Sequence, residues 1–411
     1  MATNSYNNAV KITKSAMQWL ENNTIMPRYV NTQHKTEFEA DGAKHGDTLH
    51  IRVPGSYSVR TGAAANPQGY NDVTVPVTVA QSGVDLKFTS KDMMLFLEDG
   101  EAFHRNVLGP MMAPLASYLD QGAFNLYTSI PQATGTPGTL PTDLSAYLDA
   151  GAILDDNAAP RDGQRSAILS PWSQSSLVNG LKNLFHPGQT LEEQLKTGTM
   201  GDQAGLMFSM DQNVKNHTVG TIGTSTPLMN GSTLDGATQV VTDGWASSAA
   251  TLKVGDIISI SGVYSVNPVT KATNRTLRQF VVTEDVTSSG VDMTIKISPA
   301  ITLTGPTQNV NALPANNAPI YVYGKNDNTY SAKQTNTDIV MHRDAFALVT
   351  IDMPKPQSCY FCTRIKSRVL KNISFRLIQW YNGQEDSELY RIDMMSGWAL
   401  ARPSFACRVQ G

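Results

Sequence analysis

The sequence has little charge and few cysteines for its 411 residues. Charged residues make up 16%, and 32 lysines and arginines against 35 aspartates and glutamates give a formal net charge of −3. This balance excludes a protein whose main task is to neutralise phosphates along nucleic acid, because such proteins carry a basic excess. The 31 glycines and 21 prolines are ordinary counts, which excludes disordered and collagen-like chains. We expect the chain to fold into two or three domains.

Segments that would direct the chain to a membrane or out of the cell are also missing. The first residues, MATNSYNNAVKITKSAMQWL, lack the basic-then-apolar order of a secretory signal. No run approaches the ~18 apolar residues that a membrane span needs. We therefore expect a cytosolic protein with no membrane partner, whose sparsely charged surface suits association with other proteins.

The common signatures of enzymes and metal sites are absent. There is no H-E-x-x-H, no Walker lysine loop, no G-x-G-x-x-G and no G-x-S-x-G. Glu101 and His104 form one E-x-x-H, whereas di-iron bundles use two such motifs with further glutamates. Cys359 and Cys362 form the only C-x-x-C, and Cys407 stands alone, so a four-ligand zinc site is incomplete. We predict no catalytic, cofactor or metal site and interpret the cysteines as packed strand residues, with redox or metal chemistry as the alternative.

The first third of the chain predicts a helix and a long ribbon. Apolar residues recur at helical spacing over residues 9–20, and strict alternation predicts strands at 47–53 and 73–79. The intervening residues 54–72 are rich in glycine, alanine and asparagine, which is typical of a flexible tip. Pro76 makes its strand an edge strand. Because an isolated ribbon has two exposed edges and no evident partner in its own chain, we expect it to lie on something else.

The middle of the chain predicts a mixed domain interrupted by a β-rich insertion. A buried strand at 165–169 lies between amphipathic helices, and Ser170 with Pro171 is suited to begin the second of these. This order indicates an α+β domain. Short β-rich runs separated by serine, asparagine, threonine and glycine then predict a small barrel or sandwich up to about residue 335. Patterns like those of the earlier domain resume at Asp338, so the β-rich segment is an insertion.

Two polar motifs leave alternatives open. Lys253 to Asp256, KVGD, is a sequence with which small barrels begin, and some such barrels bind nucleic acid. The interleaved aromatics of a stacking platform are missing, so we favour a structural role. Arg364, Lys366, Arg368, Lys371 and Arg376 alternate with the apolar residues Ile365, Val369 and Phe375. This basic strand face could contact acidic protein or phosphate, or be the solvated side of a half-buried sheet.

Between the ribbon and the mixed domain, apolar residues recur at helical spacing from Met112 to Tyr127 and predict a long buried helix. Taken together, the amino-terminal helix or arm, the ribbon, this long helix, the mixed domain and the insertion resemble the major coat proteins of tailed bacteriophages with the Hong Kong 97-type fold. Residues 255–283, GDIISISGVYSVNPVTKATNRTLRQFVVT, are similar to the insertion domain of the branch typified by the short-tailed Salmonella phage P-twenty-two. Residues 341–350 and 390–409 also resemble that branch. The resemblance implies an α+β fold with an N-terminal arm (1–34), an extended β-ribbon loop (35–88), a spine-helix part of a peripheral domain (89–130), an axial domain (141–220), an inserted β-barrel (221–336) and an axial and peripheral return (338–411).

The resemblance also implies the function and the partners. It describes a structural protein, not an enzyme, that assembles into pentamers and hexamers of an icosahedral head. The implied partners are further copies of itself, scaffolding protein, portal protein and packaged double-stranded DNA in weak non-specific contact, with decoration proteins as a further candidate. The head would assemble in the bacterial cytoplasm as a precursor shell that expands on maturation. Trp19, Arg60 and Tyr70 are the predicted intersubunit contacts.

Two departures from the resemblance and two alternatives bear on this prediction. Residues 234–252 are short and nearly uncharged where the namesake has a long charged loop, so we expect no ionic contact across capsomers there. Lys35, Lys44 and Lys87 are remote from the ribbon tip, so we expect no autocatalytic crosslinking. One alternative is an encapsulin-like compartment, against which the insertion argues. The other is a cytosolic enzyme or carbohydrate-binding protein with a β-rich accessory domain, which requires clustered titratable residues.

Overall fold

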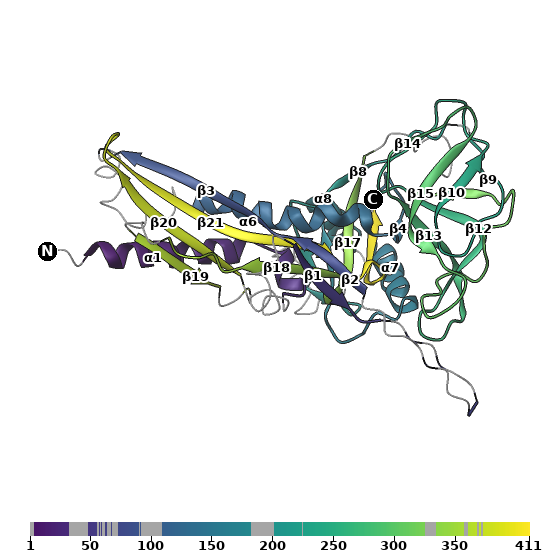
Figure 1. Cartoon of the computed structure of the whole chain (residues 1–411), viewed down its shortest axis with the longest axis horizontal. Helices are drawn as coiled ribbons and strands as arrows, with labels where there is room; N and C mark the ends of the chain where they lie inside the picture. Colours follow the sequence, from purple (N-terminus) through teal and green to yellow (C-terminus); the bar gives the residue numbers. More distant parts are fainter. Residues whose placement is uncertain are drawn as a thin grey trace. The chain divides into compact units, whose positions relative to one another are not determined.

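In the computed structural model, helices form where apolar residues recur at helical spacing, and strands form where they alternate (Figure 1). The chain divides into two units, each made of three segments: Met1–Ile51, Thr74–Ala123 and Phe346–Ala401 in the first, and Arg52–Val73, Phe124–Ala345 and Arg402–Gly411 in the second. The structure describes residues 4–32, 48–55, 57, 59, 62–63, 67, 73–89, 91, 109–181, 201–223, 225–324, 334–356, 361–367, 370 and 373–411.

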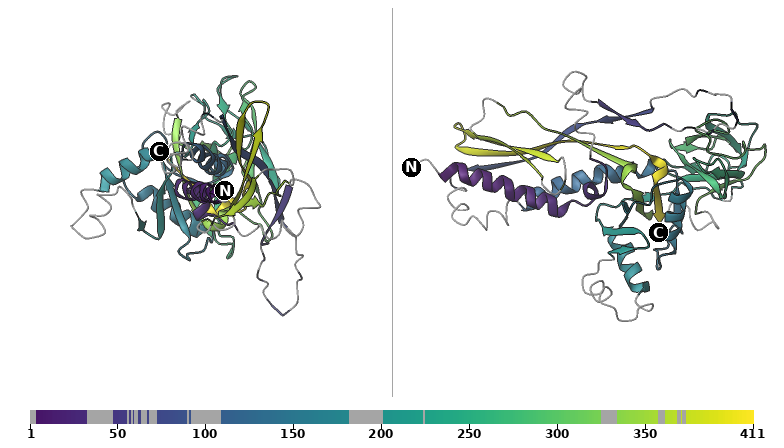
Figure 2. Two further views of the ribbon diagram at one scale, coloured as in Figure 1. Left: turned by 90° about the vertical axis from the view of Figure 1, so that its left-hand side faces the viewer. Right: turned by 90° about the horizontal axis from the view of Figure 1, so that it is seen from below.

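The first unit combines long helices with an antiparallel sheet. Its strands β18, β21, β20 and β19 are neighbours in that order, and β3 pairs with β21 along ten residues. The helices α1 and α6 lie along this sheet (Figure 2). The elements are α1 (Asn4–Asn23), α2 (Met26–Tyr29), β3 (Ala80–Thr89), α6 (Gly109–Phe124), β18 (Phe346–Ile351), β19 (Phe361–Lys366), β20 (Ser374–Asn382) and β21 (Ser387–Leu400).

Two contacts fix α6 within the first unit. The buried carboxylate of Asp120 accepts hydrogen bonds from the backbone N–H groups of Ile25 and Met26, at 3.0 and 3.1 Å, and so satisfies free donors at the start of α2. On the same helix, a Cβ at Gly122 would lie 2.4 Å from the ring of Trp398 on β21. Only glycine permits this approach, which explains why a helix interior carries a residue of low helix propensity.

The base of the ribbon consists of β1 (Thr48–Val53) and β2 (Val73–Thr78), which pair as a two-stranded sheet. Its apolar face is buried against the chain's own strands β18 and β21 in a cluster that contains Ile51 and Val77. Gly397 permits the contact, because a Cβ there would lie 2.5 Å from the carbonyl oxygen of Thr78. The expectation that the ribbon has no partner within its own chain is therefore wrong for its base, since alternation reveals a buried face but not what covers it.

The second unit contains the mixed domain that the sequence predicts. Its sheet has the order β4-β22-β17-β5-β7-β6, with β8 pairing to β17, and all five residues of β5 are buried. As predicted, Ser170 caps the next helix, accepting a hydrogen bond from Ser173 N at 3.1 Å. The elements are η3 (Asn125–Ser129), β4 (Ala133–Gly135), α7 (Ser145–Asp156), β5 (Arg165–Leu169), α8 (Pro171–Leu181), β6 (Asp202–Gln203), β7 (Leu206–Met210), β8 (Asn216–Thr218), β17 (Gln334–His342), η4 (Arg343–Ala345), η5 (Pro403–Phe405) and β22 (Ala406–Gln410).

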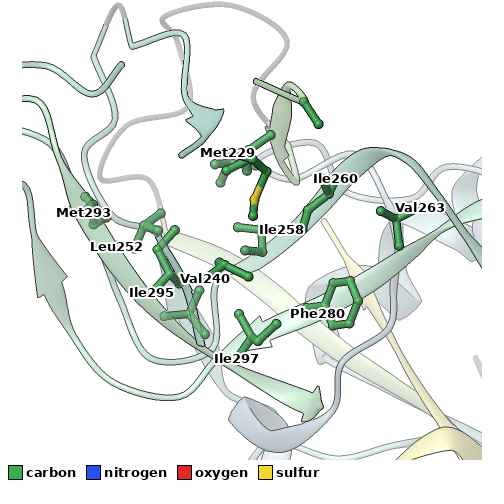
Figure 3. Close-up of a cluster of buried hydrophobic side chains, with 14 of the residues drawn as sticks. Met229, Val240, Leu252, Ile258, Ile260, Val263, Phe280, Met293, Ile295 and Ile297 are labelled. Atoms are coloured by element: carbon green, nitrogen blue, oxygen red, sulfur yellow. The ribbon is translucent and has the colours of Figure 1, made fainter. Parts of the chain in front are cut away.

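The inserted segment forms a closed barrel in the same unit. Its strands follow the order β16-β12-β13-β15-β10-β9, and hydrogen bonds from Met229 N to Ala318 O and from Ile320 N to Pro227 O join the last strand to the first. Phe280, Ile258 and Ile295 belong to its apolar core (Figure 3). The elements are β9 (Leu228–Met229), β10 (Ala237–Asp243), β11 (Thr251–Leu252), β12 (Ile257–Val266), β13 (Thr273–Val282), β14 (Val286–Thr287), β15 (Met293–Ile301) and β16 (Ile320–Val322).

Candidate functional site at the joint of the inserted barrel

The KVGD motif forms the turn that leads into strand β12 of the barrel. Asp256 N donates to Lys253 O at 2.9 Å and closes the turn, in which Gly255 has φ +95°. The carboxylate of Asp256 is buried, and its Oδ2 accepts hydrogen bonds from Lys253 N at 2.8 Å and from Gly220 N at 3.1 Å. The motif therefore uses its acidic side chain to tie the barrel to the segment that leads into it. This supports the structural interpretation of the motif.

A buried histidine links the same carboxylate to the mixed domain. His217 lies on β8, with Nε2 at 2.8 Å from Asp256 Oδ1 and Nδ1 at 3.2 Å from the hydroxyl of Tyr127 on η3. An Nε2–H that donates to Asp256 and an Nδ1 that accepts from Tyr127 satisfy all three groups. Burial raises the pKa of Tyr127, so its hydroxyl keeps the proton that it donates.

Arg408 on β22 completes this network from the mixed domain. Its side chain is fully buried, Nη1 donates to Gly255 O at 2.8 Å, and the guanidinium lies 6.0 Å from the ring centroid of Tyr127. Burial lowers the pKa of Arg408 to about 10, so the side chain stays charged at neutral pH. The carboxylate of Asp256 opposes that buried charge and favours it electrostatically. We call Tyr127, His217, Gly255, Asp256 and Arg408 the joint.

A second set of contacts holds the barrel against the edge strand β4. Gln279 on β13 accepts a hydrogen bond from Ala133 N at 2.8 Å and donates one to Ala133 O at 3.0 Å. The hydroxyl of Tyr323, which follows β16, donates to Gly135 O at 2.7 Å. Side chains of the barrel thus form hydrogen bonds with backbone N–H and C=O groups of β4, which lies at the edge of its sheet and has no neighbouring strand on that side among the described residues. With the joint, they fix the barrel on the mixed domain at two separate places.

The described residues of the basic strand face predicted near the carboxyl end are paired with acids, whereas Arg368 and Lys371 lie outside the described residues. Arg364 and Arg376 lie directly opposite each other on β19 and β20, which would be repulsive without counter-charges. Arg376 Nη2 lies 2.7 Å from the buried Asp393, and Lys366 Nζ lies 2.6 Å from Asp352. These pairs favour the interpretation of this face as one side of a half-buried sheet.

Of the three residues predicted as intersubunit contacts, only Trp19 is among the described residues. Trp19 is 37% exposed, and its ring lies beside Gly109 of α6. Arg60 and Tyr70 lie outside the described residues, as do Glu101, His104 and Cys359. Cys362 is half-buried on β19 and Cys407 is buried on β22, where burial raises the pKa of its thiol to about 12.

Of the joint, sequence reasoning singled out only the KVGD motif with Gly255 and Asp256, and it missed the other three residues. Tyr127, His217 and Arg408 are far apart in the chain and belong to no motif. The available signal was a single arginine within the alternating, otherwise apolar strand FACRV, where a buried charge requires a partner.

The chemistry of these sites is structural. In the described part of the chain, no group of three or more histidine, cysteine, aspartate or glutamate residues could hold a metal ion. Within those same residues, no helix combines the length and apolar character needed to cross a membrane. The joint buries its titratable groups and uses them on one another. The polar side chains of the joint hold the inserted barrel in place, and we interpret this arrangement as that of a structural subunit.

Comparison with known families specifies that class. A family model described as P22 coat protein, gene protein 5, matches residues 123–410, well over half of the chain. The chain belongs to this family of phage coat proteins. It is a major capsid protein of the virion head and not an enzyme, and the predicted α+β capsid fold of the Hong Kong 97 type is confirmed. As members of capsid shells, its subunits assemble with one another.

Solved phage structures resemble the chain more distantly. Mycobacterium phage Che8 has 12% identity and a TM-score of 0.44, covering 94% of this chain and 90% of that one. The capsid of the Cyanophage P-SCSP1u has 10% identity and a TM-score of 0.39, covering 89% and 83%. The CUS-3 coat protein I-domain has 29% identity over 25% of this chain and 99% of its own length, with a TM-score of 0.19. No curated protein matches the chain.

Proposed function

We propose that the chain builds the pentamers and hexamers of an icosahedral head that encloses double-stranded DNA. The head forms first as a precursor shell around scaffolding protein and expands on maturation. Portal protein occupies the shell as a further partner, decoration proteins are candidates for its outer surface, and the near-neutral charge suits weak, non-specific contact with DNA.

The ribbon carries this proposal. Its base is docked by the cluster around Ile51 and Val77, whereas the described residues beyond β1 present apolar side chains to solvent, with Tyr57 56% and Val59 91% exposed. Exposed apolar side chains on a firmly anchored ribbon are typical of a surface that another subunit covers. We assign Arg60 and Tyr70 to that contact, and the partly exposed Trp19 of the amino-terminal arm to a second one.

The proposal divides the chain by role. Residues 1–34 form the arm, 35–88 the extended loop over a neighbouring subunit, and 89–130 the spine-helix part of the peripheral domain. Residues 141–220 and 338–411 form the axial domain and the peripheral return, and 221–336 form the inserted domain. The barrel core supports treating residues 221–336 as one domain, and the joint, with Tyr127, His217 and Arg408 outside that range, supports a fixed attachment of this domain to the mixed domain.

Electron microscopy of a ribbon deletion tests the proposal. The chain is expressed with and without the neighbouring genes, as wild type and without residues 56–71, and imaged in negative stain. We expect closed shells, spirals or tubes from the wild type, and folded but unassembled subunits from the deletion, because β1 and β2 remain docked. Unchanged thermal unfolding of the deleted subunit is the control for folding. Normal shells from the deletion would refute the assignment of the ribbon, and small oligomers from every wild-type preparation would refute the shell.

A further inference from the structure

A hollow of about 210 Å³ opens beside α7 in the mixed domain. Leu148, Ala152 and Leu206 give it apolar walls, and Arg161 stands at its rim with 74% of its side chain exposed. Asp155 holds that guanidinium in place, accepting from Nε at 2.8 Å. Sites for small molecules usually enclose about 300–1,000 Å³, so this hollow has the size of a single side chain. We call it the α7 socket.

A large apolar side chain projects from the same domain. Trp172, the second residue of α8, is 70% exposed, and Met210 at the end of β7 is 44% exposed. The helix that carries Trp172 is firmly seated, because a Cβ at Gly180 would lie 1.7 Å from Thr142 O. Tryptophan is enriched among the residues that dominate protein–protein binding energy.

The socket and Trp172 lie at opposite ends of the same two strands. Strands β5 and β7 run parallel, with Ser166 beside Met207 and Leu169 beside Met210. Arg165 and Leu206 line the socket at the beginning of these strands, whereas Trp172 follows their end. A strand of five residues spans roughly 17 Å, so a subunit cannot place Trp172 in its own socket. Two copies arranged head to tail can do so, and repetition of such a contact builds a ring when its rotation closes, as the proposed capsomers require.

We propose that Trp172 of one copy inserts into the α7 socket of the next copy within a ring of subunits. The cation of Arg161 at the rim complements the negative face of the indole ring. A buried tryptophan covers about 150–250 Å², far less than the roughly 1,200–2,000 Å² of a stable interface. The contact is therefore too small to keep two free subunits together, and it sets the position of neighbouring copies within a ring. This inference rests on the proposed capsomer rings and names the surface that forms them.

Engineered cysteines test the contact directly. Trp172→Cys with Ala152→Cys, incubated as shells with a mild oxidant, should give a ladder of covalent multimers on a non-reducing denaturing gel, and reductant should collapse it. A disulfide needs Cα atoms within about 7 Å, so the roughly 17 Å strand excludes a bond within one chain. Each single variant controls for the native cysteines. Asn179→Cys with Ala152→Cys places the thiol two helical turns away and should give no ladder.

Two further variants keep the test decisive if Trp172→Cys does not assemble. Trp172→Ala empties the socket and Gly151→Trp fills it, and both should raise the subunit concentration needed for assembly by about tenfold or more. Thermal unfolding of both should match the wild type, because Trp172 is exposed and a Cβ at Gly151 meets nothing within 4 Å. If wild-type shells form and both variants assemble normally, this inference is wrong while the proposed function stands. The same holds if the double-cysteine variant forms shells that give no ladder. Absence of wild-type shells would instead refute the proposed function.

Discussion

The guanidinium of Arg408 donates a hydrogen bond to the carbonyl oxygen of Gly255 at 2.8 Å, across 153 residues of sequence. It joins the strand β22 of the mixed domain to the turn that precedes β12 of the barrel. Because Asp256 in the same turn also binds His217, the turn is held from both sides. The Gly255-Asp256 turn is therefore the point at which the inserted barrel is fixed to the mixed domain.

Replacing Arg408 by methionine should destabilise the subunit. The change removes the hydrogen bond to Gly255 and leaves the buried Asp256 without a nearby positive charge, at a cost of about 3–5 kcal/mol in the free energy of unfolding. Urea unfolding followed by fluorescence measures this cost. Arg275→Met on the exposed side of β13 is the control and should change the free energy by less than about 0.5 kcal/mol. An equal effect of both substitutions would show that the joint contributes nothing.

Gly255 should tolerate alanine less well than Gly262, although both have positive φ, +95° and +80°. A Cβ at Gly255 would lie 3.1 Å from His217 Cε1 and from Thr128 Cγ2, whereas one at Gly262 meets nothing within 4 Å. Gly262→Ala therefore carries only a backbone cost, about 1–3 kcal/mol. Gly255→Ala adds crowding of roughly 1–3 kcal/mol. Paired thermal melts should separate the two, and coincident melting temperatures would contradict the packing of the joint.

Asp338 should make the stability of the mixed domain depend on pH. This buried carboxylate accepts hydrogen bonds from Tyr147 and from Ser170 N, both at 2.8 Å, but burial raises its pKa to about 6. The native state thus binds the proton more tightly than the unfolded state. The resulting stabilisation is complete below about pH 4 and is lost as pH rises through 6, roughly 3 kcal/mol in all.

Asp338→Asn tests this dependence. The amide can accept from Ser170 N and donate to the hydroxyl of Tyr147, and it has no charge to desolvate. Unfolding in urea between pH 4 and 8 should show a smaller loss of stability for the variant and a higher free energy of unfolding at pH 8. Parallel pH profiles for variant and wild type would contradict the assignment.

Val77→Ala should loosen the base of the ribbon. The side chain is fully buried against β18 and β21, and removal of two methyl groups costs about 2 kcal/mol. We expect faster cleavage in the ribbon under limited proteolysis and a lower yield of shells. Val73→Ala, at a position 52% exposed on the same strand, is the matched control. Unchanged cleavage of the Val77 variant would contradict the docking of the base.

Elements could be predicted from the sequence where their own residues follow a clear local pattern. The all-buried strand β5, the cap at Ser170 and the barrel strands follow from local pattern and are confirmed. The docking of the ribbon base did not follow, because its cover on β18 and β21 lies some three hundred residues further along the chain. The joint as a whole did not follow either. The sequence indicates its KVGD motif, but Tyr127, His217 and Arg408 are isolated residues whose spacing carries no period.

The interleaving of segments has a consequence for synthesis on the ribosome. The barrel is one continuous stretch between Leu228 and Val322 and can fold while the rest of the chain is still being made. The sheet that holds the barrel is incomplete until Arg408 has been synthesised, because β22 lies between β4 and β17 and supplies the guanidinium. A nascent chain therefore carries a finished barrel on an unfinished sheet.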